Sequence, residues 1–259
     1  MTDQIASMPR AALVTGAARR IGRAIALALA RDGWAVAVHY RSGRDEAEAL
    51  VAELAALGRT AVALTADLAD ETATTGLVAL AQQRLGPLGL LVNNASMFEP
   101  DGALDHASAG WDAHMAANLR APVVLTQQFA RALPARAEGC AINILDQRVW
   151  NLTPHFFSYT ISKAALWTAT QTMALALAPR IRVNAIGPGP VLPSPRQSQA
   201  QFDAQCREQP LQRGATPEDI ADAVLYLTRA RAMTGQMLAL DGGQHLNWAP
   251  GAGRTVADE

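Results

Sequence analysis

The sequence predicts an α/β fold with one doubly wound sheet of seven parallel strands and helices on both of its faces. Short runs rich in apolar and β-branched residues alternate with helix-length periodic segments along nearly the whole chain. The runs are continuously apolar, which is typical of parallel strands buried on both faces. No repeat or low-complexity linker interrupts the series, so we expect a single domain.

The expected strands are short and separated by helix-length segments. They cover residues 11–16, 34–40, 60–68, 88–96, 140–145, 181–189 and 236–243. An apolar stripe at helical spacing begins at Ile21 and stops at Gly33, a residue type that commonly ends helices. Similar stripes predict helices at 46–58, 74–86, 111–133 and 163–178. Thr216 as N-cap, with Pro217 in the first position, predicts the start of a further helix.

Composition excludes several classes of function. The 259 residues are 50% apolar and 17% charged with a net charge of -1, so no nucleic-acid footprint is expected. The two cysteines and the scattered histidines lack metal-ligand spacing, so we expect no metal. Neither a signal peptide nor a membrane span is evident, which favours a cytoplasmic protein. Residues 10–247 should form the domain, between flexible tails at 1–9 and 248–259.

The stretch TGAARRIG, residues 15–22, lies between the first strand and the first helix. Free backbone N–H groups and the positive helix end at such a turn attract a pyrophosphate. Gly16 would permit close approach of the phosphates, and Gly22 would let helix and strand pack tightly. Two glycines six positions apart are also compatible with an ordinary strand-to-helix turn.

The end of the second strand indicates which nicotinamide cofactor such a turn would hold. An NAD-selective protein places an acid there for the ribose 2′-hydroxyl, but this chain has Tyr40, Arg41 and Ser42. An arginine and a hydroxyl suit a 2′-phosphate, so Arg41, with Arg19 as a second positive charge nearby, favours NADP. The alternative is that both arginines are simply solvated.

Tyr159 and Lys163 are four residues apart in YTISK and would share one face of a helix. A nearby ammonium favours the phenolate, so such a tyrosine can exchange protons closer to neutral pH than its usual pKa allows. Taken alone, this pair also fits simple packing.

Together with Asp67, NNAS at 93–96, Asn118 and PGP at 188–190, these motifs resemble the short-chain dehydrogenase/reductase family from about residue 10 to 247. The resemblance implies a seven-stranded Rossmann fold, a nicotinamide cofactor and a homotetramer. It implies Tyr159 as proton donor, Lys163 as its partner, and Asn118 in a helix distortion of the proton relay. The cofactor contacts that it implies are Gly16, Arg20, Ile21, Gly22, His39, Tyr40, Arg41, Ser42, Asp67, Leu68, Asn94, Ala95, Ser96, Tyr159, Lys163, Pro188 and Gly189.

One position departs from the general family pattern. The family has a serine thirteen residues before the tyrosine, where this chain has Asp146. An ionised carboxylate cannot donate a hydrogen bond and repels the alkoxide formed when a ketone is reduced. Asp146 instead suits a substrate with N–H groups, or one whose ring nitrogen is protonated as hydride reaches a C=N bond. Asp146 acting only as a cap, with Ser158 or Thr160 serving a carbonyl, is the alternative.

Within the family, the sequence resembles the pteridine reductases, which share the aspartate, the loop arginine matched by Arg20, NNAS, and the aromatic matched by Phe98. This resemblance implies that Phe98 and the nicotinamide sandwich a flat pterin, with Arg20, Ser96, Asp146 and Tyr159 around it. A plain core position is the alternative for Phe98. Segment 188–223 matches the family's variable substrate lid.

We therefore expect an NADPH-dependent reductase of a pterin-like small molecule. A ketone reductase of the same family, acting on a 3-oxoacyl thioester or a sugar, is the first alternative. A catalytically idle NADP-binding regulator is the second, although Tyr159, Lys163 and Asn118 are all present.

Overall fold

The computed structural model describes residues 7–246 and contains one seven-stranded, wholly parallel sheet in the order β3-β2-β1-β4-β5-β6-β7. The seven expected strands are all present; six are shorter than the apolar runs that predict them, and β5 begins one residue before its run. They are β1 (Ala11–Val14), β2 (Ala35–Tyr40), β3 (Ala61–Thr65), β4 (Leu90–Asn93), β5 (Gly139–Ile144), β6 (Ile181–Pro188) and β7 (Met237–Leu240).

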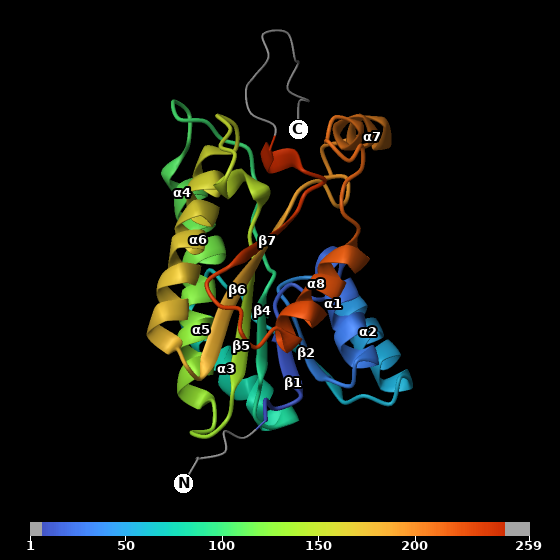
Figure 1. Cartoon of the computed structure of the whole chain (residues 1–259), viewed down its shortest axis with the longest axis vertical. Helices are drawn as coiled ribbons and strands as arrows, with labels where there is room; N and C mark the ends of the chain where they lie inside the picture. The colour runs from blue at the N-terminus through green and yellow to red at the C-terminus, as the bar shows by residue number, and fades with distance from the viewer. Residues whose placement is uncertain (1–6, 247–259) are drawn as a thin grey trace.

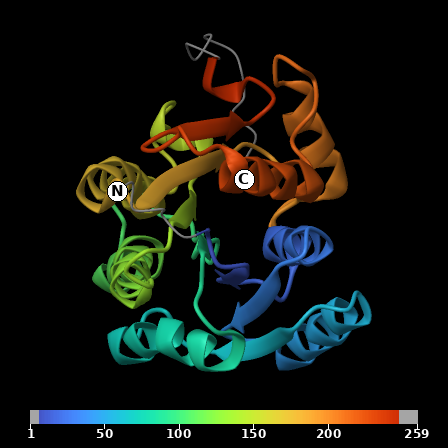
Figure 2. The same ribbon diagram turned by 60° about the horizontal axis from the view of Figure 1, so that its bottom comes forward.

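Helices cover both faces of the sheet, as predicted (Figures 1 and 2). One face carries α1 (Arg20–Arg31), α2 (Arg44–Ala56) and α8 (Pro217–Arg229), with α1 packed against α8. The other face carries α3 (Glu71–Leu85), α4 (Ser108–Met115), α5 (Ala121–Ala132) and α6 (Phe157–Leu177), with α5 between α3 and α6. The prediction of a doubly wound α/β domain is confirmed.

Strand β1 shows why the runs are apolar throughout. Ala12 and Val14 belong to the cluster under α1 and α8, whereas Ala11 and Leu13 belong to the cluster under α3 and α5. Successive side chains of a strand point to opposite faces, and both faces are covered here. All four residues are at most 4% exposed, so no position in this strand tolerates a polar side chain without a partner.

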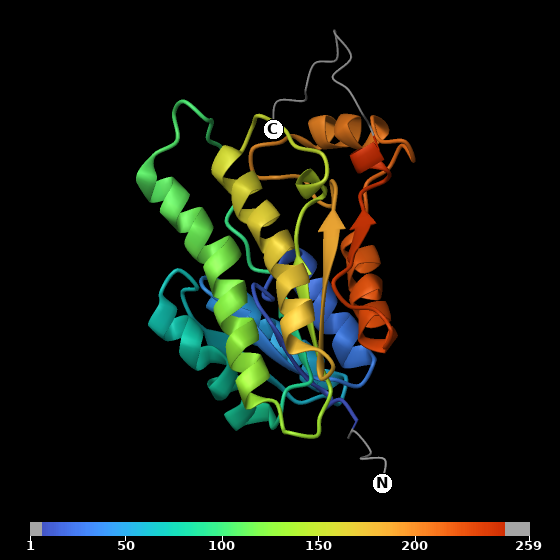
Figure 3. The ribbon, with the colours of Figure 1, turned by 60° about the vertical axis from the view of Figure 1, so that its left-hand side comes forward.

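The strand order reverses between β1 and β4, and the loops that leave the carboxyl ends of these strands diverge there. In open α/β sheets this switch point is where ligands bind. Helix α7 (Gln199–Arg207), within the expected lid segment, lies over the same end of the sheet (Figures 1 and 3).

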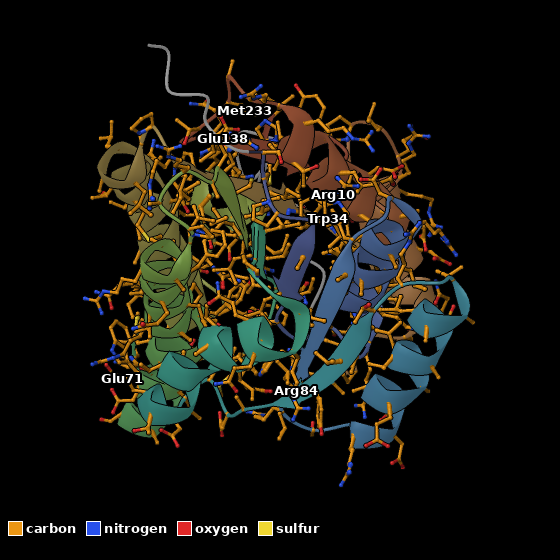
Figure 4. All side chains as sticks on the ribbon, turned by 90° about the horizontal axis from the view of Figure 1, so that it is seen from below. Arg10, Trp34, Glu71, Arg84, Glu138 and Met233 are labelled. Atoms are coloured by element: carbon orange, nitrogen blue, oxygen red, sulfur yellow. The ribbon has the colours of Figure 1, made fainter. Side chains whose placement is uncertain are left out.

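The opposite end of the sheet is closed by side-chain packing. Figure 4 shows Arg10 and Trp34 side by side there, with the Arg10 guanidinium carbon 4.4 Å from the centre of the Trp34 ring. The Trp34 indole N–H donates to Asp32, 3.1 Å away. Among residues 7–246, no helix combines the length and the apolar character needed to cross a bilayer.

The largest departures from the predicted helix bounds are at two places. The expected helix 111–133 is interrupted, because a π-helical turn, η1 (Ala116–Arg120), separates α4 from α5. The helix carrying Tyr159 begins at Phe157, six residues before the predicted body. The predicted start at Thr216 is confirmed, with its hydroxyl accepting from the Asp219 N–H at 3.1 Å.

Candidate active site

Two adjoining pockets, of about 290 and 520 Å³, open at the carboxyl ends of the strands and share a wall. Their shared residues include Arg20, Asn94, Ser96 and Phe98. Tyr159, Lys163, Pro188 and Gly189 line the smaller pocket. The other expected cofactor contacts line the larger one: Gly16, Arg20, Ile21, Gly22, His39, Tyr40, Arg41, Ser42, Asp67, Leu68, Asn94, Ala95 and Ser96.

The glycine turn between β1 and α1 needs glycine at two positions. Gly16 has φ +60, which disfavours other residues. At Gly22 a Cβ would lie 2.2 Å from the Gly16 carbonyl oxygen, inside van der Waals contact. The Thr15 hydroxyl accepts from the N–H groups of Asn94 and Ala95 at 2.9 and 3.0 Å. The Thr15 side chain therefore holds the turn against the main chain that follows β4.

The two arginines of this turn have different surroundings. Arg19 is exposed and forms an ion pair with Glu46 of α2. Arg20 begins α1 at φ +54, a left-handed conformation that is unusual for a side-chain-bearing residue. Its guanidinium donates to the lid carbonyls of Leu192 and Pro193 at 3.3 and 3.1 Å. Arg20 thus connects the glycine turn to the lid.

His39 lies beneath the turn rather than at its surface, with 1% of its area exposed. Its Nδ1 accepts from the Gly16 N–H at 3.1 Å, and its Nε2 lies 3.1 Å from the Ala66 carbonyl oxygen. Only the neutral ring with hydrogen on Nε2 satisfies both contacts. Burial lowers the pKa of His39 to about 4, against the opposing effects of Ala66 and Asp67.

Tyr159 and Asp146 meet in the smaller pocket. The Tyr159 hydroxyl donates to Asp146 Oδ2 at 3.0 Å. Lys163, one helical turn further along α6, donates to the Ile144 carbonyl at 2.8 Å and is 2% exposed. Burial lowers the pKa of Lys163 to about 8, against the opposing charge of Asp146. The pocket therefore places a phenol, a carboxylate and a buried amine within one small volume.

Asn118 lies in the π-helical turn, so the helix distortion expected from the family resemblance is present. Its amide nitrogen donates to the Met97 carbonyl at 2.9 Å and to the Ser162 hydroxyl at 3.1 Å. Its amide oxygen accepts from the Met97 N–H at 2.8 Å and from the Ser96 hydroxyl at 3.2 Å. Asn118 thereby joins the loop after β4 to helix α6.

Asp146 makes contacts that fit both interpretations that the sequence left open. It caps a short 3₁₀ turn, η2 (Gln147–Val149), by accepting from the Arg148 N–H at 2.8 Å, and it also accepts from Tyr159. Ser158 and Thr160 line neither pocket. Ser158 is fully buried, with its hydroxyl bonded to Asp101 and 2.7 Å from His114 Nδ1.

Phe98 is half-buried and lines both pockets. One of its faces stacks on Phe156, with ring centres 4.2 Å apart and planes 8° from parallel. The edge contact with Tyr159 has a centre-to-centre distance of 4.7 Å. Because Phe156 is 3% exposed and lines neither pocket, it fixes Phe98 from behind.

The sequence did not indicate several residues of the smaller pocket. Gln147 and Arg148 follow Asp146 directly in the sequence. The available signal was the charge of Arg148, two positions after a carboxylate that was expected in the site. Lid residues also line this pocket: Leu192, Ser194, Gln197, Phe202 and Gln205. In contrast, Trp150, Asn151 and Phe156 do not line it. Over residues 7–246 there is no cluster of three or more potential metal ligands.

Comparison with known proteins places this geometry in a family. Residues 16–245 match the family model described as enoyl-(acyl carrier protein) reductase. The chain is 50% identical to FolM alternative dihydrofolate reductase 1 from Brucella suis, solved in complex with NADP, with a TM-score of 0.90 over 92% of this chain and 96% of that one.

Two further similarities broaden the comparison. A short-chain dehydrogenase/reductase from Serratia marcescens is 34% identical, with a TM-score of 0.85 over 91% of this chain and 98% of that one. The 3-oxoacyl-(acyl-carrier-protein) reductase FabG of Staphylococcus epidermidis is 32% identical over 244 residues, which cover 92% of this chain and all of the relative.

Proposed function

The chain belongs to the short-chain dehydrogenase/reductase family, and from this premise we propose that it is an NADPH-dependent reductase of a pterin-like heterocycle. Hydride would be transferred to the carbon of a ring C=N bond, and Tyr159 would donate a proton to the nitrogen. The observation that carries the proposal is the hydrogen bond from the Tyr159 hydroxyl to Asp146 Oδ2, at the position where a ketone reductase needs a neutral donor.

The chain's residues fit a dinucleotide in the larger pocket. A Cβ on Gly16 would lie 3.0 Å from the Ala95 Cα, and a Cβ on Gly22 would collide with the Gly16 carbonyl oxygen. Glycine at both positions is therefore needed to keep the turn in this shape. The start of α1 would hold the pyrophosphate, and Arg41 the 2′-phosphate. NADPH, when bound, would supply the hydride. The NADP complex of the Brucella suis FolM protein supports this assignment.

Protonation of the substrate would depend on the groups around Tyr159. The phenol would give its proton to the ring nitrogen, and the buried Lys163 ammonium would stabilise the resulting phenolate. Asn118 is hydrogen-bonded both to the loop after β4 and to α6, and it would hold these two segments of the proton relay in position. Phe98, held from behind by Phe156, would offer its other face to the flat ring, which restricts the orientation of the C=N bond.

Asp146 would contribute to substrate choice. A carboxylate accepts hydrogen bonds from substrate N–H groups but opposes a developing alkoxide. The name of the FolM protein, an alternative dihydrofolate reductase, supports a pteridine ring system. We also propose a cytoplasmic homotetramer, as the family resemblance implies.

Reduction of a 3-oxoacyl thioester is the second candidate. It is favoured by the 32% identity to a 3-oxoacyl-(acyl-carrier-protein) reductase. It is opposed by Asp146, because the Tyr159 hydroxyl donates to this carboxylate, at the position where a ketone reductase has a serine. Ser96 and Ser194, the hydroxyl side chains of the smaller pocket, lie on the loop after β4 and on the lid.

The deciding experiment follows NADPH oxidation by the purified protein with dihydropterins, with acetoacetyl thioesters and with simple ketones. We expect turnover with dihydropterins alone, and we expect Tyr159→Phe to lower kcat by about 10²- to 10⁴-fold while NADPH still binds. Turnover of ketones alone would refute the pterin assignment. Cofactor binding without turnover of any substrate would favour an NADP-binding regulator.

A further inference from the structure

Arg148 lies in the smaller pocket, where neither the family motifs nor the proposed function gives it a role. Its side chain is 12% exposed, although it carries a full positive charge. Burying a charge is costly unless that charge is paired, so the site needs a reason for an arginine here. Asp146 is among its partners: Arg148 Nη1 lies 3.5 Å from Asp146 Oδ2.

The Arg148 guanidinium stands beside the phenylalanine stack. Its carbon is 5.3 Å from the centre of the Phe98 ring and also 5.3 Å from that of Phe156. Because these rings are nearly parallel and 4.2 Å apart, equal distances put the guanidinium at their shared edge rather than over either outer face. The guanidinium therefore does not cover the outer face of Phe98.

Asp146 Oδ2 is the common partner of Tyr159 and Arg148. The Tyr159 hydroxyl donates to it at 3.0 Å, and Arg148 Nη1 forms an ion pair with it at 3.5 Å. The other oxygen, Oδ1, accepts from the Arg148 backbone N–H at 2.8 Å. Arg148 thus contacts both carboxylate oxygens, one through its main chain and one through its side chain. This arrangement fixes the rotation of the carboxylate.

We propose that Arg148 is a positioning residue that holds the Asp146 carboxylate in place and aimed at the Tyr159 hydroxyl. The expected effect of Arg148 on turnover rests on the proposed function. The positioning of Asp146 rests only on the contacts among Arg148, Asp146 and Tyr159. Arg148 balances the negative charge of Asp146, so that the carboxylate can accept from Tyr159 or from substrate N–H groups without opposing formation of the phenolate.

The charged and titratable groups that face Asp146 come from three elements. Tyr159 and Lys163 lie on α6, Arg148 on the 3₁₀ turn, and Arg20 lines the same pocket from the start of α1. Arg20 is bonded to lid carbonyls, and Lys163 to the Ile144 carbonyl. Arg148 is the cation for which the structure shows an ion pair with Asp146.

Arg196 provides a matched control. Its guanidinium carbon is 5.3 Å from the Phe98 ring centre and 5.5 Å from that of Phe156, so it flanks the same stack. Its ion pair is with Glu99, however, at 3.2 Å. Arg196→Met therefore removes a guanidinium of equal size from the stack without touching Asp146.

The test combines a double-mutant cycle with a titration that needs no substrate. Arg148→Met, Asp146→Asn and the double variant are compared in kcat and KM for a dihydropterin, with NADPH binding measured in each. The ionisation of Tyr159 is followed by near-ultraviolet absorbance against Tyr159→Phe, which is practical because the chain has three tyrosines.

We expect Arg148→Met to lower kcat by about tenfold or more and to move the Tyr159 midpoint up by roughly one pH unit. The same change should cost much less in the Asp146→Asn background, because the carboxylate through which Arg148 acts is gone. Arg196→Met should leave the midpoint in place. Arg148→Lys should restore the midpoint in part.

Additive effects in the cycle, or equal midpoint shifts in Arg148→Met and Arg196→Met, would overturn the proposal. The titration separates this result from failure of the proposed function. If no dihydropterin is reduced but the midpoint moves as expected, then the pterin assignment fails and the positioning role of Arg148 stands.

Discussion

The two pockets are built in different ways. The larger pocket is shaped mainly by main chain: a glycine turn, the ends of β1, β2 and β4, and backbone N–H groups that donate to the Thr15 and His39 side chains. The smaller pocket is shaped by side chains from α6, the 3₁₀ turn and the lid. Few substitutions are compatible with a fixed backbone turn, whereas a residue that lines a pocket only with its side chain can be replaced without changing its neighbours. We therefore expect changes in the first pocket to affect both stability and cofactor binding, and changes in the second to affect catalysis or substrate affinity alone.

The largest effect is expected from Gly22→Ala. The new methyl would lie 2.2 Å from the Gly16 carbonyl oxygen and 2.8 Å from the Ala17 Cα, and these main-chain atoms cannot move without opening the turn. We expect the free energy of unfolding to fall by about 3 kcal/mol and NADPH affinity to drop more than tenfold. Urea unfolding and cofactor titration measure both quantities.

Gly76→Ala is the matched control for that change. Gly76 lies within α3 with nothing within 4 Å of the added Cβ, so the substitution should stabilise the helix by up to about 1 kcal/mol. If Gly22→Ala behaved like Gly76→Ala, then the turn would not depend on backbone space, and the contrast between the two pockets would be lost.

The second effect concerns pH. Because the pKa of His39 is lowered from 6.5 to about 4, the unfolded chain binds a proton more readily than the folded one between these values. The stability associated with the neutral ring is complete above about pH 6.5 and is lost as the pH falls towards 4. The loss should reach about 3 kcal/mol.

His39→Gln tests this by keeping an acceptor and a donor that do not titrate. Urea unfolding at several pH values should show a flatter dependence for His39→Gln than for the unsubstituted protein. His106→Gln, at an exposed position, should leave the dependence unchanged. Equal slopes in all three proteins would mean that His39 does not hold the turn through its neutral form.

The sequence was sufficient for the elements whose signal is local. Fully buried strands are continuously apolar, and Thr216 with Pro217 fixes a helix start through its own hydrogen bonds, so both were predictable. The π-helical turn at Asn118 came only from the family resemblance. Asn118 in this turn is bonded to Met97 and Ser162, which are distant in sequence, and no periodicity encodes these bonds.

The smaller pocket was the less predictable one for the same reason. The contact of Arg148 with Asp146 depends on a short 3₁₀ turn and on the stack formed by Phe98 and Phe156. Phe156 itself has φ +54 without being a glycine, so composition gave no indication of its backbone. His39 was expected as a cofactor contact, and the structure places it under the turn, bonded to Gly16.

The third prediction separates Arg41 and Arg19, the two arginines proposed to lie near the 2′-phosphate. Arg41 is exposed on the wall of the larger pocket, whereas Arg19 is paired with Glu46. A charge-assisted hydrogen bond is worth about 1.5–3 kcal/mol, so Arg41→Ala should weaken NADPH binding by about 10- to 150-fold. NADH affinity should not change, because NADH lacks the 2′-phosphate. Arg19→Ala should cost less, and a uniform loss for both cofactors would refute the assignment of Arg41.

The smallest effect is expected from Phe98→Leu, on the substrate side. Leucine keeps apolar contact with Phe156 but removes the aromatic face, and stacking is worth about 0.5–1.5 kcal/mol beyond the buried area. KM for a dihydropterin should therefore rise by about 2- to 12-fold, with NADPH affinity and the urea midpoint nearly unchanged. Phe98→Tyr, which keeps the ring, should retain the original KM. Phe98 also lines the larger pocket. A loss of NADPH affinity as large as the rise in KM would therefore show that Phe98 serves both pockets. In that case the substrate pocket could not be altered independently of the cofactor pocket.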